Sequence, residues 1–209
     1  TAAEYAALGL PTPTEKTVVI QLVDEEGNTV TDMLGNEIIT EQTITDAIQE
    51  FERTLLTPDS RFDLYLKGDK AAIGSEEIEG YSLFKQAGCA TCHVGENLGG
   101  QSYELMGLRA DYFGDRGTEL TFEDNGRNKE TKLERDIHRF KVPGLRNVAL
   151  TAPYFHDGTQ ATLEDAVKAM GKYESGVEFD DAQVAKIVSF LKSLTGKYKG
   201  AVLTNDNLK

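Results

Sequence analysis

One short motif constrains this chain more than any other feature: Cys89-Ala-Thr-Cys92-His93 has the pattern C-x-x-C-H. Two thiols at this spacing can form thioethers with two vinyl groups on one porphyrin edge, and the histidine that follows can swing under the iron. The motif therefore predicts one covalently attached haem c, with His93 as an axial ligand. It also predicts a periplasmic location, because this haem is attached outside the cytoplasm.

Other chemistries of a cysteine pair fit the motif less well. The chain has only these two cysteines, and a disulfide between them would close a very small loop and stabilise little. A thioredoxin-like redox pair needs a preceding strand, whereas the pattern before Cys89 is that of an amphipathic helix. A zinc site needs further ligands nearby, but His138 and His156 are isolated and distant in sequence.

Composition and charge narrow the class of protein. The chain has 209 residues, of which 39% are hydrophobic and 27% charged, as in ordinary globular proteins. Its formal net charge of −13 repels nucleic acid and anionic membranes, so we expect no nucleic-acid partner. No apolar run approaches membrane-spanning length. The sequence begins at Thr1 rather than Met, from which we expect that a leader or further protein was removed upstream.

Apolar periodicity predicts a mainly α fold, and the single haem motif makes a domain of the single-haem cytochrome c type the expected one. Helices are predicted to begin near residues 43, 75, 162 and 181, and Pro58, Gly88, Gly171 and Gly196 are predicted to end them. We expect the second and fourth of these helices to cross. The residues expected to face the core are Ile44, Ile48, Phe51, Leu55, Ile78, Tyr81, Phe84, Val184, Ile187, Val188, Leu191 and Leu194.

The remaining segments divide the chain into an N-terminal extension over 1–40, a haem domain over 41–199 and a polar tail over 200–209. Within the extension, Thr17–Val23 has strand character and could pair back with Thr29–Thr31 or Glu37–Thr40 as a small β-hairpin. The alternative is a loosely ordered leader. Residues 61–70 read as a polar connector anchored by Phe62 and Tyr65. The long irregular stretch over 94–141 predicts loops that wrap the haem.

The second axial ligand of the iron is not determined by spacing alone. The candidates are Met33, Met106, Met170, His138 and His156. A methionine is more often core filler, and a lone histidine is more often a surface or hydrogen-bonded residue. A soft thioether suits haem iron in electron transfer. We favour Met170, because it ends a short amphipathic helix, whereas Met106 follows His93 too closely to cross the ring face easily and His138 has charged neighbours that suggest exposure.

Several longer segments resemble the C-terminal, electron-transferring half of the bacterial di-haem cytochrome c peroxidases. They are Glu50–Leu55 with Thr57–Asp63, Gly80–His93 with Asn97–Gln101, and above all Val142–Gly158 with Leu163–Gly171. We place the resemblance over about residues 43–196. It implies that Met170 is the distal ligand, a position at which related enzymes that mature a tryptophan-derived cofactor carry tyrosine. It also implies a calcium ion bound partly by the backbone carbonyls of Thr151 and Pro153.

The sequence also departs from that family. It contains one C-x-x-C-H motif and no tryptophan, so the peroxide-reducing haem domain and the tryptophan that bridges the two haems have no counterpart in it. Residues 1–40 show no resemblance to the missing domain. The chain is therefore predicted to be either a natural single-haem relative or the electron-transfer half of a longer protein.

We therefore expect electron transfer through one haem c with His93 and Met170 as axial ligands. Pro143 is expected to accept a hydrogen bond from the distal nitrogen of His93, and Arg146 and Gln101 are expected to contact haem propionates, with a surface salt bridge as the alternative for Arg146. The partner would be a small cytochrome, a cupredoxin or a peroxidatic haem domain. One alternative is membership in a complete peroxidase that reduces hydrogen peroxide; another is a binding module in which the haem is structural.

Overall fold

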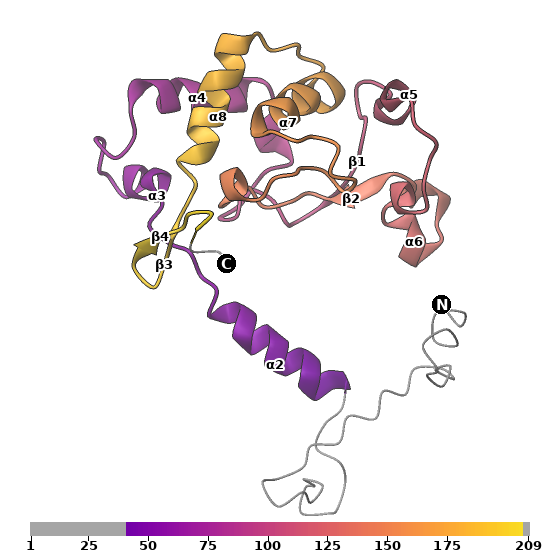
Figure 1. The fold of residues 1–209 in the computed structure, drawn as a ribbon, viewed down its shortest axis with the longest axis horizontal. Coiled ribbons are helices and arrows are strands. Elements are labelled where there is room, and N and C mark those ends of the chain that lie inside the picture. The colour runs from indigo at the N-terminus through magenta and orange to yellow at the C-terminus, as the bar shows by residue number, and fades with distance from the viewer. Residues whose placement is uncertain (1–40, 207–209) are drawn as a thin grey trace, which may run out of the picture. The chain divides into compact units, whose positions relative to one another are not determined.

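The computed structural model describes residues 41–206, so the predicted hairpin over 17–40 and the candidate ligand Met33 lie outside the described residues. Contacts divide the chain after Leu56 into two units, whereas the sequence placed the start of the haem domain at residue 41. Within the described residues the fold is mainly helical, as predicted, with two small two-stranded sheets (Figure 1). None of the described helices has the length and apolar character needed to cross a membrane.

The first unit contains one described element, helix α2 (Glu41–Arg53). Its helical periodicity is confirmed, but the helix ends five residues before Pro58 rather than at it. The apolar stripe lies largely in solvent, since Ile48 is 52% exposed and Phe51 61%.

In the second unit, residues 61–70 begin with a helix rather than the predicted connector. Helix α3 (Arg61–Leu66) starts at Ser60, whose hydroxyl accepts from the amide of Asp63 while the Asp63 carboxylate accepts from the amide of Ser60. This reciprocal capping box satisfies two amides that the first helical turn would leave unpaired. The helix places Phe62, an expected anchor, in the core with 4% exposure.

The core is built where helices α4 (Ser75–Gln86) and α8 (Asp181–Lys192) cross, as predicted (Figure 1). Gly80 lies at the crossing, and a Cβ atom at this position would come within 1.9 Å of the Lys186 carbonyl oxygen. Only glycine permits this approach. The expected inward position of Ile78 is wrong, because its side chain is 38% exposed while Gly80 occupies the buried side.

Aromatic and aliphatic side chains fill the space around this crossing. Phe190 is fully buried, with ring centroids 5.1 Å from Phe62 and 5.4 Å from Phe84. Sequence periodicity correctly placed the buried face of α8 but not Phe190. The other core residues of α8 and its C-terminal end are Val184, Ile187, Val188, Leu191 and Leu194.

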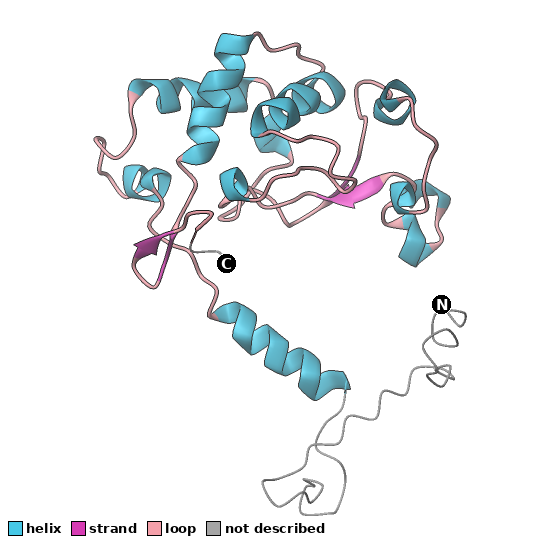
Figure 2. Cartoon of the chain, in the orientation of Figure 1, coloured by secondary structure: helices cyan, strands magenta, loops and turns pink. Residues whose placement is uncertain are grey.

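Between the haem motif and α7, the chain consists mostly of loops, as predicted (Figure 2). Short elements interrupt them: β1 (Tyr103–Leu105), α5 (Tyr112–Arg116), α6 (Asn128–Thr131) and β2 (Arg139–Lys141). Strands β1 and β2 pair antiparallel, with Tyr103 opposite Lys141 and Leu105 opposite Arg139. This pairing joins the beginning and the end of the irregular stretch over residues 94–141.

The C-terminal part contains α7 (Leu163–Met170), capped by the Thr162 hydroxyl as predicted, and a hairpin after α8. The predicted polar tail is partly ordered, because β3 (Lys197–Tyr198) pairs with β4 (Ala201–Val202). Leu203, with 9% exposure, packs after the hairpin, and the Lys197 amide donates to the Pro58 carbonyl at 2.9 Å.

Candidate haem site

The C-x-x-C-H motif forms a compact turn at the end of α4. Gly88, with φ of 80°, ends the helical path as predicted, and a 3₁₀ turn, Cys89–Thr91, follows it. Both thiols are free and partly buried. Burial raises the pKa of the Cys89 thiol, and burial together with the carboxylates of Glu104 and Glu174 raises that of Cys92. The thiols are therefore neutral at ordinary pH.

The imidazole of His93 is held in one tautomer by the backbone. Its Nδ1 donates to the Leu98 carbonyl at 3.0 Å, which leaves the lone pair on Nε2 for a metal. Burial lowers the pKa of His93, while the carbonyls of Leu98 and Pro143 oppose that shift. Pro143 was the expected acceptor of this hydrogen bond. In this structure the bond goes to the Leu98 carbonyl, and the Pro143 carbonyl contributes by raising the pKa of His93.

The loop that carries Leu98 packs against the segment that carries Pro143. The Gly100 amide donates to the Val142 carbonyl at 2.7 Å, and the Leu145 amide donates to the Asn97 carbonyl at 2.9 Å. Gln101 is exposed at the end of this loop, and its amide nitrogen fills the space where a Cβ of Gly95 would lie. Backbone hydrogen bonds therefore fix the orientation of the His93 ring.

The guanidinium of Arg146 forms a bidentate ion pair. Its two terminal nitrogens donate to the Asp63 carboxylate at 2.8 and 2.9 Å, and its Nε donates to the Glu96 carbonyl at 2.6 Å. Burial would raise the pKa of Asp63, but hydrogen bonds from Arg146 and Ser60 lower it overall. Arg146 thus joins α3 to the loop after the haem motif. Its contact with a propionate, and that of Gln101, stay predictions.

Met170 is the last residue of α7, but Gly171 does not end the helical path there. The chain continues as a π-helical turn, Gly171–Ser175, and leaves the helix at Gly176 in the left-handed conformation. Gly171 is required for a different reason: a Cβ atom would lie 2.6 Å from the Phe179 ring. Turns of this type often occur at functional sites.

This π-helical turn reaches the haem motif. The hydroxyl oxygen of Ser175 lies 3.9 Å from Cys89 Sγ. The carboxylate of Glu174 in the same turn also helps to raise the pKa of Cys92. The fold therefore places the chain that follows Met170 beside the cysteines, 80 or more positions away in sequence.

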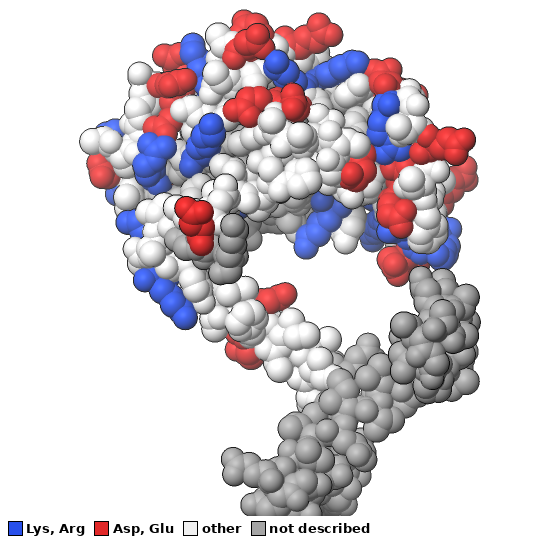
Figure 3. Space-filling view, viewed as in Figure 1, with Lys and Arg blue, Asp and Glu red and all other residues white. Residues whose placement is uncertain are grey.

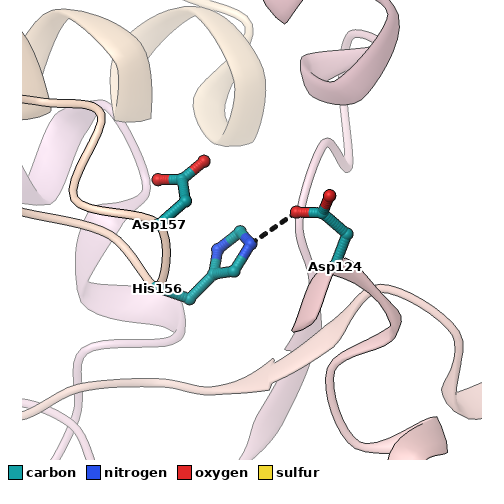
Figure 4. Close-up of side chains that lie close together, drawn as sticks. All are labelled: Asp124, His156 and Asp157. Carbon is teal, nitrogen blue, oxygen red and sulfur yellow. Dashed lines mark hydrogen bonds and ion pairs between the residues drawn. The ribbon is translucent and has the colours of Figure 1, made fainter. Parts of the chain in front are cut away.

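Both remaining histidines have other partners. His138 is half-buried rather than exposed: its ring stacks on Phe113 with centroids 4.2 Å apart, and Nδ1 donates to the Asp124 carbonyl at 2.7 Å. His156 stacks on Phe140 at 4.3 Å, and its Nε2 lies 2.7 Å from the Asp124 carboxylate (Figure 4). These contacts favour structural roles for the two rings.

Asp124, His156 and Asp157 converge closely enough to hold a metal ion, but the guanidinium of Arg116 already binds both carboxylates. The guanidinium donates two hydrogen bonds to Asp124, at 2.7 and 2.8 Å, and one to Asp157 at 2.8 Å. Arg116 already pairs with both carboxylates, so the cluster is an ion-pair network with Asp124 as its buried member. The sequence analysis missed it, since Asp124 and His156 are 32 positions apart in irregular segments without periodicity.

Met106, the other methionine candidate, lines a surface groove of about 780 Å³ together with His138 and Phe113. Its amide donates to the His138 carbonyl at 2.9 Å. Met106 directly precedes Gly107, whose amide donates to the Glu174 carboxylate in the π-helical turn after Met170.

Thr151 and Pro153, the expected calcium ligands, lie exposed in the loop before α7. The loop is fixed at its next residue, because the Tyr154 hydroxyl donates to the Val148 carbonyl at 2.9 Å. The calcium role of the two carbonyls stays a prediction.

The residues at the motif fit a covalent haem. Two free thiols and an imidazole with an available Nε2 form the required donor set. Large apolar side chains on the surrounding segments are exposed, namely Val94, Tyr103 and Leu108, as expected for residues that cover an apolar cofactor. Acidic and basic side chains lie interspersed on the face shown in Figure 3.

Comparisons with known proteins define the class. Residues 78–195 match the family model of cytochrome c, and residues 9–71 match that of di-haem cytochrome c peroxidase. The chain therefore belongs to the cytochrome c family. The second match extends to residue 9, so the expectation that resemblance begins near residue 43 is wrong.

Its relatives narrow the class further, to the di-haem cytochrome c peroxidase family. A cytochrome c peroxidase of Escherichia coli strain K12 is 55% identical over 158 residues, which cover 75% of this chain and 33% of that protein. Cytochrome c551 peroxidase of Nitrosomonas europaea is 49% identical over 164 residues, covering 78% of this chain and 47% of that protein. The chain thus spans between a third and a half of these two relatives.

A solved structure supports the same assignment. A MauG-like protein associated with microbial copper homeostasis aligns with a TM-score of 0.61 and 29% identity, over 76% of this chain and 58% of that chain. The fold predicted from the sequence, a mainly helical cytochrome c domain, is confirmed.

Proposed function

We propose that this chain transfers electrons through one covalently bound haem c whose axial ligands are His93 and Met170. Cys89 and Cys92 would hold the ring through thioethers. The cofactor supplies a one-electron couple when it is bound, and the protein determines the ligands and surroundings. The observation that carries the proposal is the position of the π-helical turn after Met170 beside Cys89.

His93 supports this function through its fixed ring. The hydrogen bond from Nδ1 to Leu98 sets the tautomer before any ligand binds and raises the basicity of Nε2. An electron-transfer site works best when both oxidation states keep the same ligands. A ring held by buried backbone meets that need, because it has little freedom to reorient.

Met170 supports the proposal through chemistry and position. A neutral thioether favours ferrous over ferric iron and raises the reduction potential. The rings of His138 and His156 are hydrogen-bonded to Asp124. The backbone amide of Met106, rather than its thioether, is bonded to the His138 carbonyl. Met170 is the candidate that leads directly into the turn touching Cys89.

An absorption spectrum tests this proposal. The oxidised protein is expected to be low-spin and six-coordinate, with no accessible position for peroxide. Turnover of hydrogen peroxide with a reduced electron donor is then expected to be negligible. A high-spin spectrum with rapid turnover would contradict electron transfer as the function of the chain by itself.

A second candidate function is that the chain forms part of a complete hydrogen-peroxide-reducing enzyme. It is favoured by relatives that are cytochrome c peroxidases and of which this chain spans between a third and a half. The electron would then pass to a peroxidatic haem domain rather than to a separate protein. A second C-x-x-C-H motif elsewhere in the encoded protein would favour this candidate.

Three further assignments belong to the same proposal. Covalent haem attachment implies a periplasmic location. The redox partner would be a small cytochrome, a cupredoxin or a peroxidatic haem domain. The carbonyls of Thr151 and Pro153 would bind calcium if another part of the protein completed the ligand set.

A further inference from the structure

The π-helical turn Gly171–Ser175, which follows Met170, is bound along its length by the segment 107–115. The amide of Arg109 donates to the Tyr173 carbonyl at 2.8 Å. The amide of Gly107 donates to the Glu174 carboxylate at 2.7 Å. Two residues of the segment therefore donate to two consecutive residues of the turn.

Side chains extend this attachment. Lys172 Nζ lies 2.6 Å from the Asp115 carboxylate, to which the Tyr173 hydroxyl also donates at 3.2 Å. The Tyr173 ring packs edge-on against Tyr112, with centroids 5.2 Å apart and planes at 88°. Polar and aromatic contacts thus link the turn to α5 as well as to the loop before it.

The opposite side of the turn is also fixed. Gly171 packs against Phe179, and its carbonyl accepts from the Val177 amide at 2.8 Å. Ser175 lies beside Cys89. The turn is therefore held between the haem attachment on one side and segment 107–115 on the other, with Met170 immediately before it.

We propose that Glu174 is a positioning residue that holds Met170 on the haem iron by tying the turn after Met170 to the amide of Gly107. Glu174 does not touch the ligand itself, since it lies four residues further along the chain. This inference rests on the proposed His93–Met170 ligation and adds what keeps that ligation in place.

The physical reason is the preference of backbone amides for an ionised acceptor. Charge-assisted hydrogen bonds are about twice as strong as neutral ones, and Glu174 is only partly exposed. Removing the carboxylate leaves the Gly107 amide without this acceptor. The turn then keeps only its contacts through Lys172 and Tyr173 with the segment and is held less firmly. The methionine-off state then gains population, because the bound state no longer benefits from the contact.

Imidazole binding to the ferric holoprotein measures this population, since imidazole competes with Met170 for the iron. If the equilibrium constant for Met170 binding to the iron falls by some factor, the apparent affinity of the protein for imidazole rises by the same factor. We expect Glu174→Ala to bind imidazole at least tenfold more tightly than the parent. Glu174→Gln, which keeps one acceptor oxygen, should lie between them. Glu178→Gln serves as the control, because Glu178 is exposed just beyond the turn.

The outcomes separate this inference from the proposed function. Unchanged imidazole affinity in Glu174→Ala and Glu174→Gln, with a far-red sulfur–iron band in the parent, would overturn the role of Glu174 and leave Met170 as ligand. A lower melting temperature with unchanged affinity would show a merely structural role and would also overturn it. Should Glu174→Ala fail to fold, Glu174→Gln decides by the same criterion. Absence of the band from the parent would remove both proposals.

Discussion

The sulfur of Cys89 lies 3.9 Å from the hydroxyl oxygen of Ser175, although 86 positions separate the two residues in sequence. Cys89 begins the haem attachment motif, and Ser175 ends the π-helical turn that follows Met170. The contact places the turn that follows Met170 against the haem attachment motif. It gives a structural basis for combining His93 and Met170 as ligands of one iron.

Covalent attachment predicts that denatured protein keeps its haem. The two thiols are free and lie on one turn, as thioether formation requires. We expect the protein to retain haem staining on a denaturing gel and to gain the mass of one haem by mass spectrometry. Extraction of the haem by acidic organic solvent, or a gain of two haem masses, would contradict this prediction.

The contacts of His156 predict that it is not an iron ligand. Its Nε2 is bonded to Asp124 and its ring stacks on Phe140. The variant His156→Ala should therefore keep a low-spin, six-coordinate spectrum. Conversion to a high-spin spectrum would mean that His156, rather than Met170, supplies the second ligand.

The buried pair of Arg116 and Asp124 predicts a specific pH dependence of stability. Hydrogen bonds from Arg116 hold the pKa of the Asp124 carboxyl well below its usual range. A carboxyl whose pKa is depressed by folding stabilises the protein above its unfolded pKa, about 4, and this contribution is lost as the pH falls below that value. The free energy of unfolding of the holoprotein should therefore fall steeply below about pH 4.

The variant Asp124→Asn tests this pair. Breaking a buried ion pair costs about 3–5 kcal/mol, and Asp124 is 1% exposed, so we expect a loss of this order at neutral pH. The acid dependence should also become shallower. Glu79→Gln is the matched control, because Glu79 forms a pair with Lys186 that is exposed. Equal losses in the two variants, or an unchanged acid profile in Asp124→Asn, would disagree with this account.

Local patterns in the sequence predicted the elements whose own residues determine them. The buried face of α8 follows helical periodicity, and the Thr162 cap marks the start of α7. The haem motif was also recognisable, because its chemistry depends on consecutive residues. In each case the residues that predict the feature lie in the same short segment of sequence as the feature itself.

Features set by distant contacts could not be predicted in this way. Ile78 faces outward because α8 approaches α4 at Gly80. Gly171 is required because Phe179 and the Val177 carbonyl fill the space of a Cβ atom. The Asp63 partner of Arg146 is 83 positions away. Periodicity carries no information on such pairs, which depend on how the loops close.

The identity of the second axial ligand is the central claim, and the far-red absorption of the oxidised protein tests it most directly. Sulfur–iron charge transfer produces a weak band in this region when a methionine is bound. We predict that the parent shows the band and that Met170→Ala loses it and becomes high-spin, while Met106→Ala retains it. A band that is absent from the parent, or that survives in Met170→Ala, would contradict ligation by Met170.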